Sequence, residues 1–349
     1  MPSRGGTIIT GLVMFKRVVA LCFSPLGDAL FATPAIRALR FNLPQARIVI
    51  LANQLGVEIF KNNPYQIEVV NCLDQWDLLK KTVEIRKQGF DLALGLSQIG
   101  SFFTRFCGTP FRSDFFSVQE KNNLSVVKRC LEVVNEAGLA VNTYETEFWF
   151  SESEERKVES FLKHAGYDFK RPLLAVHCGG HYFIRKRWPL FNFIRLIETV
   201  NEETPYQVIL VGGKEDREDA ALIQSILPGI INTAGCFRLG ETAALLKKCR
   251  LLIANDSGPL HLGAAIGTPT IGLFGPTTPD QFFPYRRPPH RYIYKKLSCS
   301  PCYRFGGGLW QYLPRCSKAY CMEEIQVCEV LELVMDRGLA GMNSLVEVT

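Results

Sequence analysis

The sequence lacks a segment that could span a membrane, because no apolar run approaches the roughly 20 residues that cross a bilayer. The short apolar run at 7–15 is followed at once by Lys16-Arg17 and has no small-residue cleavage site, so we expect a tail and not a signal peptide. Low-complexity segments and short repeats are also missing. The charge excess is small, +6 from 40 Lys and Arg against 34 Asp and Glu, and it predicts no nucleic-acid binding.

Three familiar phosphate and metal motifs are missing as well. The chain has no GxxxxGK[ST], no GxGxxG after its first predicted strand and no Asp-x-Asp pair. These absences argue against a P-loop enzyme and against a dedicated carboxylate site for a divalent metal. We therefore expect neither a cofactor nor a catalytic metal, and any bound phosphate would have to be neutralised by the protein's own cations.

Twelve cysteines are present. Eight are scattered along the chain, and most of these fall in apolar strand or helix patterns where a free thiol acts as a small hydrophobe. This usage predicts a reducing compartment, the cytoplasm. The other four have a spacing close to that of a zinc ribbon: Cys299, Cys302, Cys316 and Cys321. A structural zinc and a set of free or partly paired thiols are the two interpretations.

The remaining sequence, of ordinary globular composition, alternates strands and helices in two series. Apolar strands are predicted at 16–23, 46–52, 66–70 and 90–96, with helices at 28–43, 76–87 and 124–137. The alternation starts again after about residue 150. We expect an α/β protein with two Rossmann-like, doubly wound domains, 14–150 and 151–349, that face a cleft, with the last helix packing back on the first domain.

The loop "SPLGDA" after the first predicted strand is well placed for chemistry, because ligands of open parallel sheets bind at the carboxyl ends of the strands. Gly27 permits a tight turn, and Asp28 lies at or near the start of the next helix. Asp28 has two interpretations that do not exclude each other. It is a helix cap, or it is a general base that takes a proton from an attacking hydroxyl.

A second loop lies in "LLIANDSGPLHLGAAIG", where a buried strand leads into a small-residue helix. The amides of Ser257 and Gly258, with the Ser257 hydroxyl, form a predicted anion cradle at the positive end of the helix. Asp256 precedes the cradle, and His261 lies one turn into the helix. An ordinary capped turn is the alternative, but it does not explain why Ser, Gly and His converge there.

Two further groups complete the predicted donor site. "HCGGHYFIRKRWP" combines Gly179 with the cations Lys186 and Arg187, a set that suits a diphosphate. The alternative for this loop is a solvated basic surface. Glu241 opens the helix "LGETAALL", either as a first-turn carboxylate at the helix dipole or as an acceptor for ribose hydroxyls.

These motifs resemble glycosyltransferase family 9, the family of the ADP-heptose:lipopolysaccharide heptosyltransferases. The resemblance rests on "SPLGDALFATPAIRALR", "RKRWP", "VILVGG", "ETAALLKKCRLLIANDSGPLHLGAAIGTPTIGLFGPT" and "CSPC…CM", which run in family order from residue 17 to about 335. It implies a GT-B fold in which 14–150 binds the acceptor and 151–349 binds the nucleotide-sugar donor. It also implies metal-independent, inverting transfer of heptose from ADP-heptose to the inner core of lipopolysaccharide. By motif position, Asp28 matches the family's proposed base, Lys186 matches its phosphate-binding lysine, and Glu241 matches its acidic residue on the nucleoside side. The residues that match the family's donor loop are Asp256, Ser257, Gly258 and His261.

The same resemblance implies the partners. They are ADP-heptose or a related nucleotide sugar, a lipid-anchored acidic oligosaccharide and the anionic inner face of the inner membrane, where we expect a peripheral monomer. Basic residues available for that surface in the first half are Lys80, Lys81, Arg86, Lys87, Arg105, Arg112, Lys121, Lys128 and Arg129. Three alternatives stay open: another nucleotide sugar or acceptor, a nucleotide-sugar epimerase, and an inactive homologue that binds the membrane surface.

Overall fold

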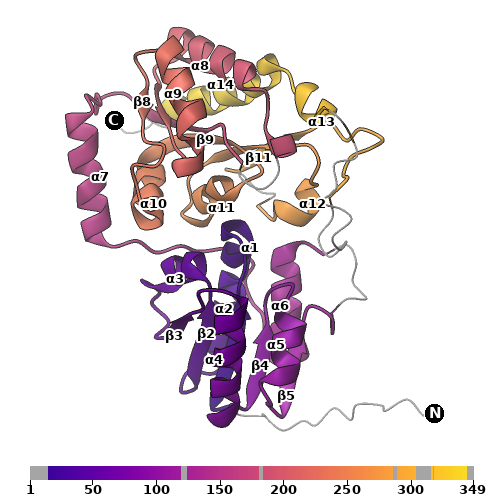
Figure 1. The fold of residues 1–349 in the computed structure, drawn as a ribbon. Coiled ribbons are helices and arrows are strands. Elements are labelled where there is room, and N and C mark those ends of the chain that lie inside the picture. Colours follow the sequence, from indigo (N-terminus) through magenta and orange to yellow (C-terminus); the bar gives the residue numbers. More distant parts are fainter. Residues whose placement is uncertain are drawn as a thin grey trace.

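The computed structural model describes residues 15–118, 124–180, 184–285, 289–303, 316 and 318–343. Within them the chain forms two halves, each built on its own parallel sheet (Figure 1). The first sheet has five strands in the order β3-β2-β1-β4-β5: β1 (Arg17–Cys22), β2 (Arg47–Ala52), β3 (Glu68–Asn71), β4 (Leu92–Gly95) and β5 (Phe111–Asp114). The second has six in the order β11-β10-β9-β6-β7-β8: β6 (Leu173–His177), β7 (Gln207–Leu210), β8 (Ile231–Asn232), β9 (Cys249–Asn255), β10 (Thr270–Phe274) and β11 (Arg291–Tyr294).

Helices connect these strands and cover both faces of each sheet. The first half contains α1 (Leu26–Phe31), α2 (Thr33–Asn42), α3 (Gln54–Phe60), α4 (Gln75–Lys87), α5 (Gly100–Phe106) and α6 (Val126–Glu136). The second contains α7 (Glu152–His164), η1 (Ile184–Lys186), α8 (Leu190–Glu203), η2 (Lys214–Asp216), α9 (Arg217–Ile226), α10 (Leu239–Lys248), α11 (Gly258–Ala265), α12 (Pro279–Phe282), α13 (Tyr320–Glu323) and α14 (Val327–Asn343).

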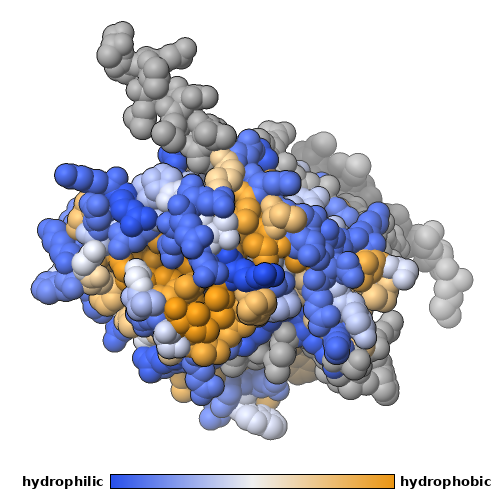
Figure 2. All heavy atoms as spheres, turned by 90° about the horizontal axis from the view of Figure 1, so that it is seen from above, coloured by the Kyte–Doolittle hydropathy of each residue, from blue (hydrophilic) through white to orange (hydrophobic). Residues whose placement is uncertain are grey.

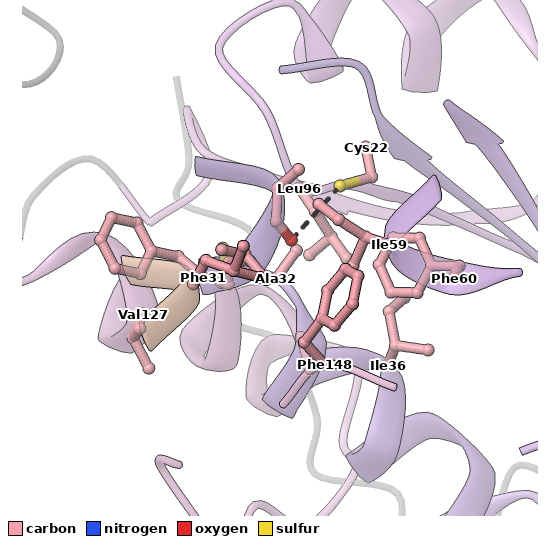
Figure 3. Packing of buried hydrophobic residues seen from close by; sticks show 14 of the residues in the cluster. Cys22, Phe31, Ala32, Ile36, Ile59, Phe60, Leu96, Val127 and Phe148 are labelled. Carbon is pink, nitrogen blue, oxygen red and sulfur yellow. Dashed lines mark hydrogen bonds between the residues drawn. The ribbon is translucent and has the colours of Figure 1, made fainter. Parts of the chain in front are cut away.

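The apolar runs of the central strands are continuous because both faces of each sheet are buried. In β1, Val18 and Ala20 belong to the cluster that packs on α2 and α6, whereas Val19 and Leu21 belong to the cluster that packs on α4 and α5. Figure 3 shows the first of these clusters, in which Ile36 of α2 lies among aromatic and aliphatic neighbours from other elements. The central strands of both sheets thereby hold the loops at their carboxyl ends in fixed positions.

The second sheet has the strand order typical of dinucleotide-binding domains when it is counted from β6. The two-domain, doubly wound architecture predicted from the sequence is therefore present. The sequence predicted that the last helix packs back on the first domain. This prediction is wrong for the part of α14 whose side chains are described. Its Val330 and Val334 lie in the core of the second half, where α14 packs on α8 and not on the first half.

One predicted helix is split in two. The sequence predicts a single helix over 28–43, but the structure has α1 and α2 with a break at Ala32. Pro34 explains the break, because it has no N–H to donate to the preceding turn. The break lets α1 point toward the second half while α2 stays on the first sheet.

The two halves touch where α1 meets α11, which lie one above the other in Figure 1. Glycines make the approach possible. A Cβ added to Gly27 would lie 2.7 Å from Cδ2 of His261, and one added to Gly258 would lie 2.7 Å from Cδ2 of Leu26. The predicted base loop and the predicted donor loop are thus neighbours in space, although some 230 residues separate them in the chain.

Candidate active site

Asp256 is the hub of the site. It follows β9 and is buried, and three side chains reach its carboxylate: Lys186 Nζ at 2.8 Å, Thr277 Oγ1 at 2.6 Å and His261 Nε2 at 3.3 Å. Burial alone would raise the pKa of Asp256, but the Lys186 ammonium and the His261 ring hold it well below its usual range. Asp256 is therefore an ionised anchor that fixes Lys186, which also lies over the rings of Phe282 and Tyr303.

The N-terminus of α11 lies beside this hub. Ser257 is the N-cap residue, but its side chain makes no capping hydrogen bond. The Ser257 hydroxyl instead lies 3.0 Å from His177 Nδ1 and 3.0 Å from the carbonyl oxygen of Asn255. The first-turn amides of α11 are left without a side-chain cap, at the end of the helix where the dipole favours an anion.

His261 fills the seam between the halves. Its buried ring contacts the edge of Phe31 from the first half, with centroids 4.7 Å apart, and lies against Gly27. Nε2 faces Asp256, whereas Nδ1 is buried and has no hydrogen-bond partner in the part of the chain that is described. A buried polar atom without a partner is uncommon in folded proteins, and this one lies at the seam between the two halves.

Asp28 approaches the same hub from the first half. The prediction that it lies at the helix cap is imprecise, because α1 begins at Leu26 with Pro25 as N-cap and Asp28 lies inside the first turn. Burial raises the pKa of Asp28 to about 6; the nearby Lys186 opposes this shift, and Asp256 adds to it. Among the described residues nothing donates a hydrogen bond to this carboxylate. A poorly solvated, unpaired carboxylate with a pKa close to neutrality is suited to general-base work.

Two other predicted donor residues are already engaged by protein groups. Glu241 caps α10, with Oε2 accepting the Arg238 amide at 2.8 Å and Oε1 paired with Lys157 at 2.6 Å. This geometry bears out the helix-dipole interpretation of Glu241, and its contact with ribose stays a prediction. Arg187 pairs with Asp219 at 2.7 Å and donates to the carbonyl oxygen of Gly180.

Sequence reasoning missed the residues that hold the loops in place. Asn255 is completely buried; its side-chain amide donates to the carbonyls of Cys178 and Gly179, and its oxygen accepts the Trp188 amide at 3.0 Å. His177, Asp216 and Thr277 were also missed. The sequence did contain a signal for two of these residues, since Asn255 and His177 are polar residues directly at the end of a buried apolar strand. Asp216 and Thr277 have no such signal.

Comparison with known proteins identifies the family. The model of "Glycosyltransferase family 9 (heptosyltransferase)" matches residues 105–307, more than half of the chain. The chain belongs to glycosyltransferase family 9. Similar proteins include lipooligosaccharide heptosyltransferase 2 of Haemophilus influenzae, 32% identical over 128 residues, and lipooligosaccharide heptosyltransferase 2 of Campylobacter jejuni, 22% identical over 287 residues.

The extent of these matches differs. The alignment with the Haemophilus protein spans 35% of this chain and only 37% of that protein, whereas the Campylobacter alignment spans 79% and 86%. Among solved structures, the family 9 glycosyltransferase from Veillonella parvula superposes with a TM-score of 0.75 at 20% identity, covering 93% of this chain and 97% of that one. E. coli ADP-heptose lps heptosyltransferase II gives 0.73 at 21%, with 93% and 99% covered. These likenesses confirm the GT-B fold.

The cysteine cluster of this family 9 protein carries no metal site in the described residues, since no three His, Cys, Asp or Glu side chains there are arranged to hold an ion. Among the described residues, none of these four cysteines forms a disulfide: Cys299, Cys302, Cys316 and Cys321. Burial raises the pKa of Cys321 to about 11, and the three nearby thiols add to the shift. The zinc and thiol interpretations of this cluster both stay predictions.

No helix among the described residues is long and apolar enough to cross a membrane. Large apolar side chains are nevertheless exposed on both halves. In the first they include Leu73 just before α4, Trp76 on α4, and Phe102 and Phe106 on α5. On the face of the second half that is seen from above, apolar residues gather in patches among polar ones (Figure 2).

Proposed function

We propose that this chain is an inverting heptosyltransferase that moves heptose from ADP-heptose to the inner core of lipopolysaccharide without a metal ion. The observation that carries the proposal is the pairing across the seam. An unpaired Asp28 from the first half shares its surroundings with the Lys186–Asp256 pair and the uncapped start of α11. A base on one side and an anion cradle on the other suit transfer between two substrates.

The proposed chemistry uses both sides of the seam in one step. Asp28 takes the proton from an acceptor hydroxyl while the oxygen attacks the anomeric carbon of the donor sugar from the face opposite the diphosphate. The bond from that carbon to the diphosphate oxygen breaks, and ADP leaves. Lys186 and the first-turn amides of α11 stabilise the negative charge that develops on the leaving diphosphate. A single displacement of this kind inverts the anomeric configuration.

Glu241 is the proposed contact of the donor nucleoside. In the structure its Oε1 is held by Lys157, whose side chain is 59% exposed. An exposed lysine is easily released to water, because a partly exposed ion pair adds little stability. Ribose hydroxyls could therefore replace Lys157 on Glu241 while Oε2 continues to cap α10.

A panel of nucleotide sugars tests this proposal directly. The protein is incubated with ADP-heptose, other ADP-sugars and UDP-sugars, with and without a deacylated core oligosaccharide, and released nucleoside diphosphate is measured. We expect acceptor-dependent release of ADP from ADP-heptose, a product of inverted configuration by NMR, and no loss of rate in EDTA. The metal-free expectation rests on the protein cations at the cradle and on the missing Asp-x-Asp pair. Release from another donor alone would keep the transferase proposal and reject ADP-heptose, whereas loss in EDTA with rescue by Mg²⁺ would reject metal independence.

We further propose that the first half docks on the anionic inner face of the inner membrane. Exposed apolar side chains on α4 and α5 lie among exposed cations of the same segments, namely Lys80, Arg86, Lys87, Arg105 and Arg112. Each such cation near an anionic leaflet adds about 1 kcal/mol of attraction, and aromatic side chains suit the interface. Not every predicted cation is available: Arg129 is buried, Lys81 pairs with Asp77, and Lys121 lies outside the described residues.

Liposome co-sedimentation tests the docking proposal. We expect binding to anionic but not to neutral vesicles, with loss of binding at about 0.5 M salt because exposed charges are then screened. Trp76→Ala should weaken the binding, whereas Phe191→Ala, an equally exposed aromatic on α8 of the second half, should not. Equal binding to both vesicle types, or equal loss in both variants, would contradict this part of the proposal and leave the transferase proposal standing.

A further inference from the structure

A second set of hydrogen-bonded side chains lies behind the anion cradle. Apart from the Ser257 hydroxyl, the chemistry described so far does not use it. His177 ends β6, Asp216 ends η2, and Ser257 precedes α11. Ser257 Oγ lies 3.0 Å from His177 Nδ1, and His177 Nε2 lies 3.2 Å from Asp216 Oδ2. His177 and Asp216 are each only 3% exposed. The exposed end of this set is the Ser257 hydroxyl, which faces the proposed donor diphosphate.

The backbone is shaped around the Asp216 carboxylate. A Cβ on Gly179 would lie 1.6 Å from Asp216 Oδ1, and one on Gly212 would lie 2.6 Å from Oδ2. The Gly213 amide also donates to Oδ2 at 2.8 Å. Burial works to raise the pKa of Asp216, but the His177 ring and the Gly213 amide hold it below its ordinary value. An ionised Asp216 requires a proton on His177 Nε2, whatever the state of Nδ1.

The protons of His177 and Ser257 can be arranged in two ways. With neutral His177, Nδ1 has no proton and accepts one from Ser257, so the hydroxyl presents only lone pairs to the cradle. With protonated His177, Nδ1–H donates to Ser257 Oγ, and the hydroxyl proton is free to go either to the Asn255 carbonyl oxygen, 3.0 Å away, or to an anion in the cradle. A diphosphate has only acceptors, so it is repelled by the first arrangement and bound by the second.

We infer that His177, held by Asp216, is a positioning residue that turns the Ser257 hydroxyl into a hydrogen-bond donor, and that a diphosphate in the cradle binds together with a proton taken up by His177. This inference rests on the proposed function, which places the donor diphosphate at α11. An imidazole is suited to the task because its charge changes near neutral pH. The negative diphosphate favours the imidazolium, and the buried Asp216 carboxylate balances its charge.

The other charged groups near His177 already form ion pairs. Arg187, on the loop that follows β6, pairs with Asp219 of α9 at 2.7 Å. On the β9 side, Asp256 pairs with Lys186. Burial raises the pKa of the adjacent Cys178 thiol to about 12, so this side chain stays neutral. Of the groups named here, His177 is the one whose ring contacts the Ser257 hydroxyl, so a His177 variant is the one that tests the coupling.

Calorimetric titration of ADP into the full chain tests the inference. Measurements from about pH 6 to about pH 9, each in two buffers of different ionisation heat, give the affinity and the number of protons taken up. We expect more proton uptake in the wild-type protein than in His177→Gln, and an ADP affinity that falls with rising pH only in the former. The phosphate of ADP titrates equally in both measurements, so their difference reports His177. His164→Gln, an exposed histidine on α7, is the matched control and should behave as wild type.

Ser257→Ala keeps the buried pair and removes only the hydroxyl, so it remains informative if His177→Gln does not fold. We expect its ADP affinity to be about 10-fold lower than wild type at low pH, where Ser257 donates, and nearly unchanged at high pH. A uniform loss at every pH, or equal proton uptake in wild type and His177→Gln, would overturn the inference while leaving ADP binding intact. Failure of the wild-type protein to bind ADP would instead remove the proposed donor together with the inference.

Discussion

Asp28 and Asp256 are the same residue type in similar places, yet their environments make them opposites. Each lies beside a short helix that follows a central strand, and each is removed from most of the solvent. Asp256 is held by Lys186, His261 and Thr277, and its pKa is far below the ordinary value. Asp28 has no such partners among the described residues, and burial raises its pKa to about 6. Partners, and not burial alone, decide whether a carboxylate anchors a site or stays basic enough to react.

The largest expected effect comes from removing the basic carboxylate. Asp28→Asn should slow heptosyl transfer by about 10²- to 10⁴-fold, because the amide cannot accept the acceptor's proton. The dissociation constant of ADP should hardly change, since Asp28 faces the acceptor. Steady-state kinetics and calorimetry measure the two quantities. Asp74→Asn, at an exposed N-cap that asparagine can also supply, is the control, and a near-wild-type rate in Asp28→Asn would remove Asp28 from the mechanism.

Removing the anchoring carboxylate should damage the fold instead. Asp256→Asn leaves the Lys186 ammonium without its counter-charge in a mostly buried site, and breaking a buried pair typically costs about 3–5 kcal/mol. Urea denaturation measures the free energy of unfolding of this variant and of Asp28→Asn side by side. Equal destabilisation of the two variants would show that Asp256 does not anchor the fold more strongly than Asp28 does.

Lys186 lies next to both carboxylates, so its removal affects each in a different way. Lys186→Ala should weaken ADP binding by about 10- to 150-fold, through loss of a charge-assisted hydrogen bond. Because Lys186 lowers the pKa of Asp28, the rising limb of the pH–rate profile should also move above its wild-type position near pH 6. Lys170→Ala, an exposed lysine of the same half, should change neither quantity. If the pH–rate profile of Lys186→Ala does not move, Lys186 does not influence the pKa of Asp28.

The smallest effect is the pH dependence of stability. The folded state holds the Asp28 proton more tightly than the unfolded chain does, so the stability that this group contributes is fully present below about pH 4 and is lost as the pH rises to about 6. Asp28→Asn should therefore be more stable than wild type at neutral pH by about 1–2 kcal/mol, since part of the carboxyl reaches water. Denaturation at about pH 4 and about pH 7 measures this difference, and a difference that does not grow with pH would contradict the raised pKa.

The sequence by itself predicted the alternation of strands and helices, because the buried strands are continuous apolar runs and α7 begins with a capping box at Ser151. It also predicted where the candidate loops lie, since Asp28, Lys186 and the 256–261 loop all lie at carboxyl ends of strands or beside them. The short α3, α5, α12 and β11 were missed. Their segments are too short for periodicity to separate them from loops. The division at 150/151 stays a prediction, and α7 begins at Glu152.

Only the tertiary structure decided what each of these residues does in its place. Glu241 caps a helix and pairs with Lys157, and Asp256 is held by Lys186 as an ionised anchor. The physical reason is that a pKa and a hydrogen bond depend on neighbours brought together across long stretches of chain. His177 and Asp216 show this most clearly. Nothing in their local sequence relates them to Ser257, and only the strand order of the second sheet brings the three together.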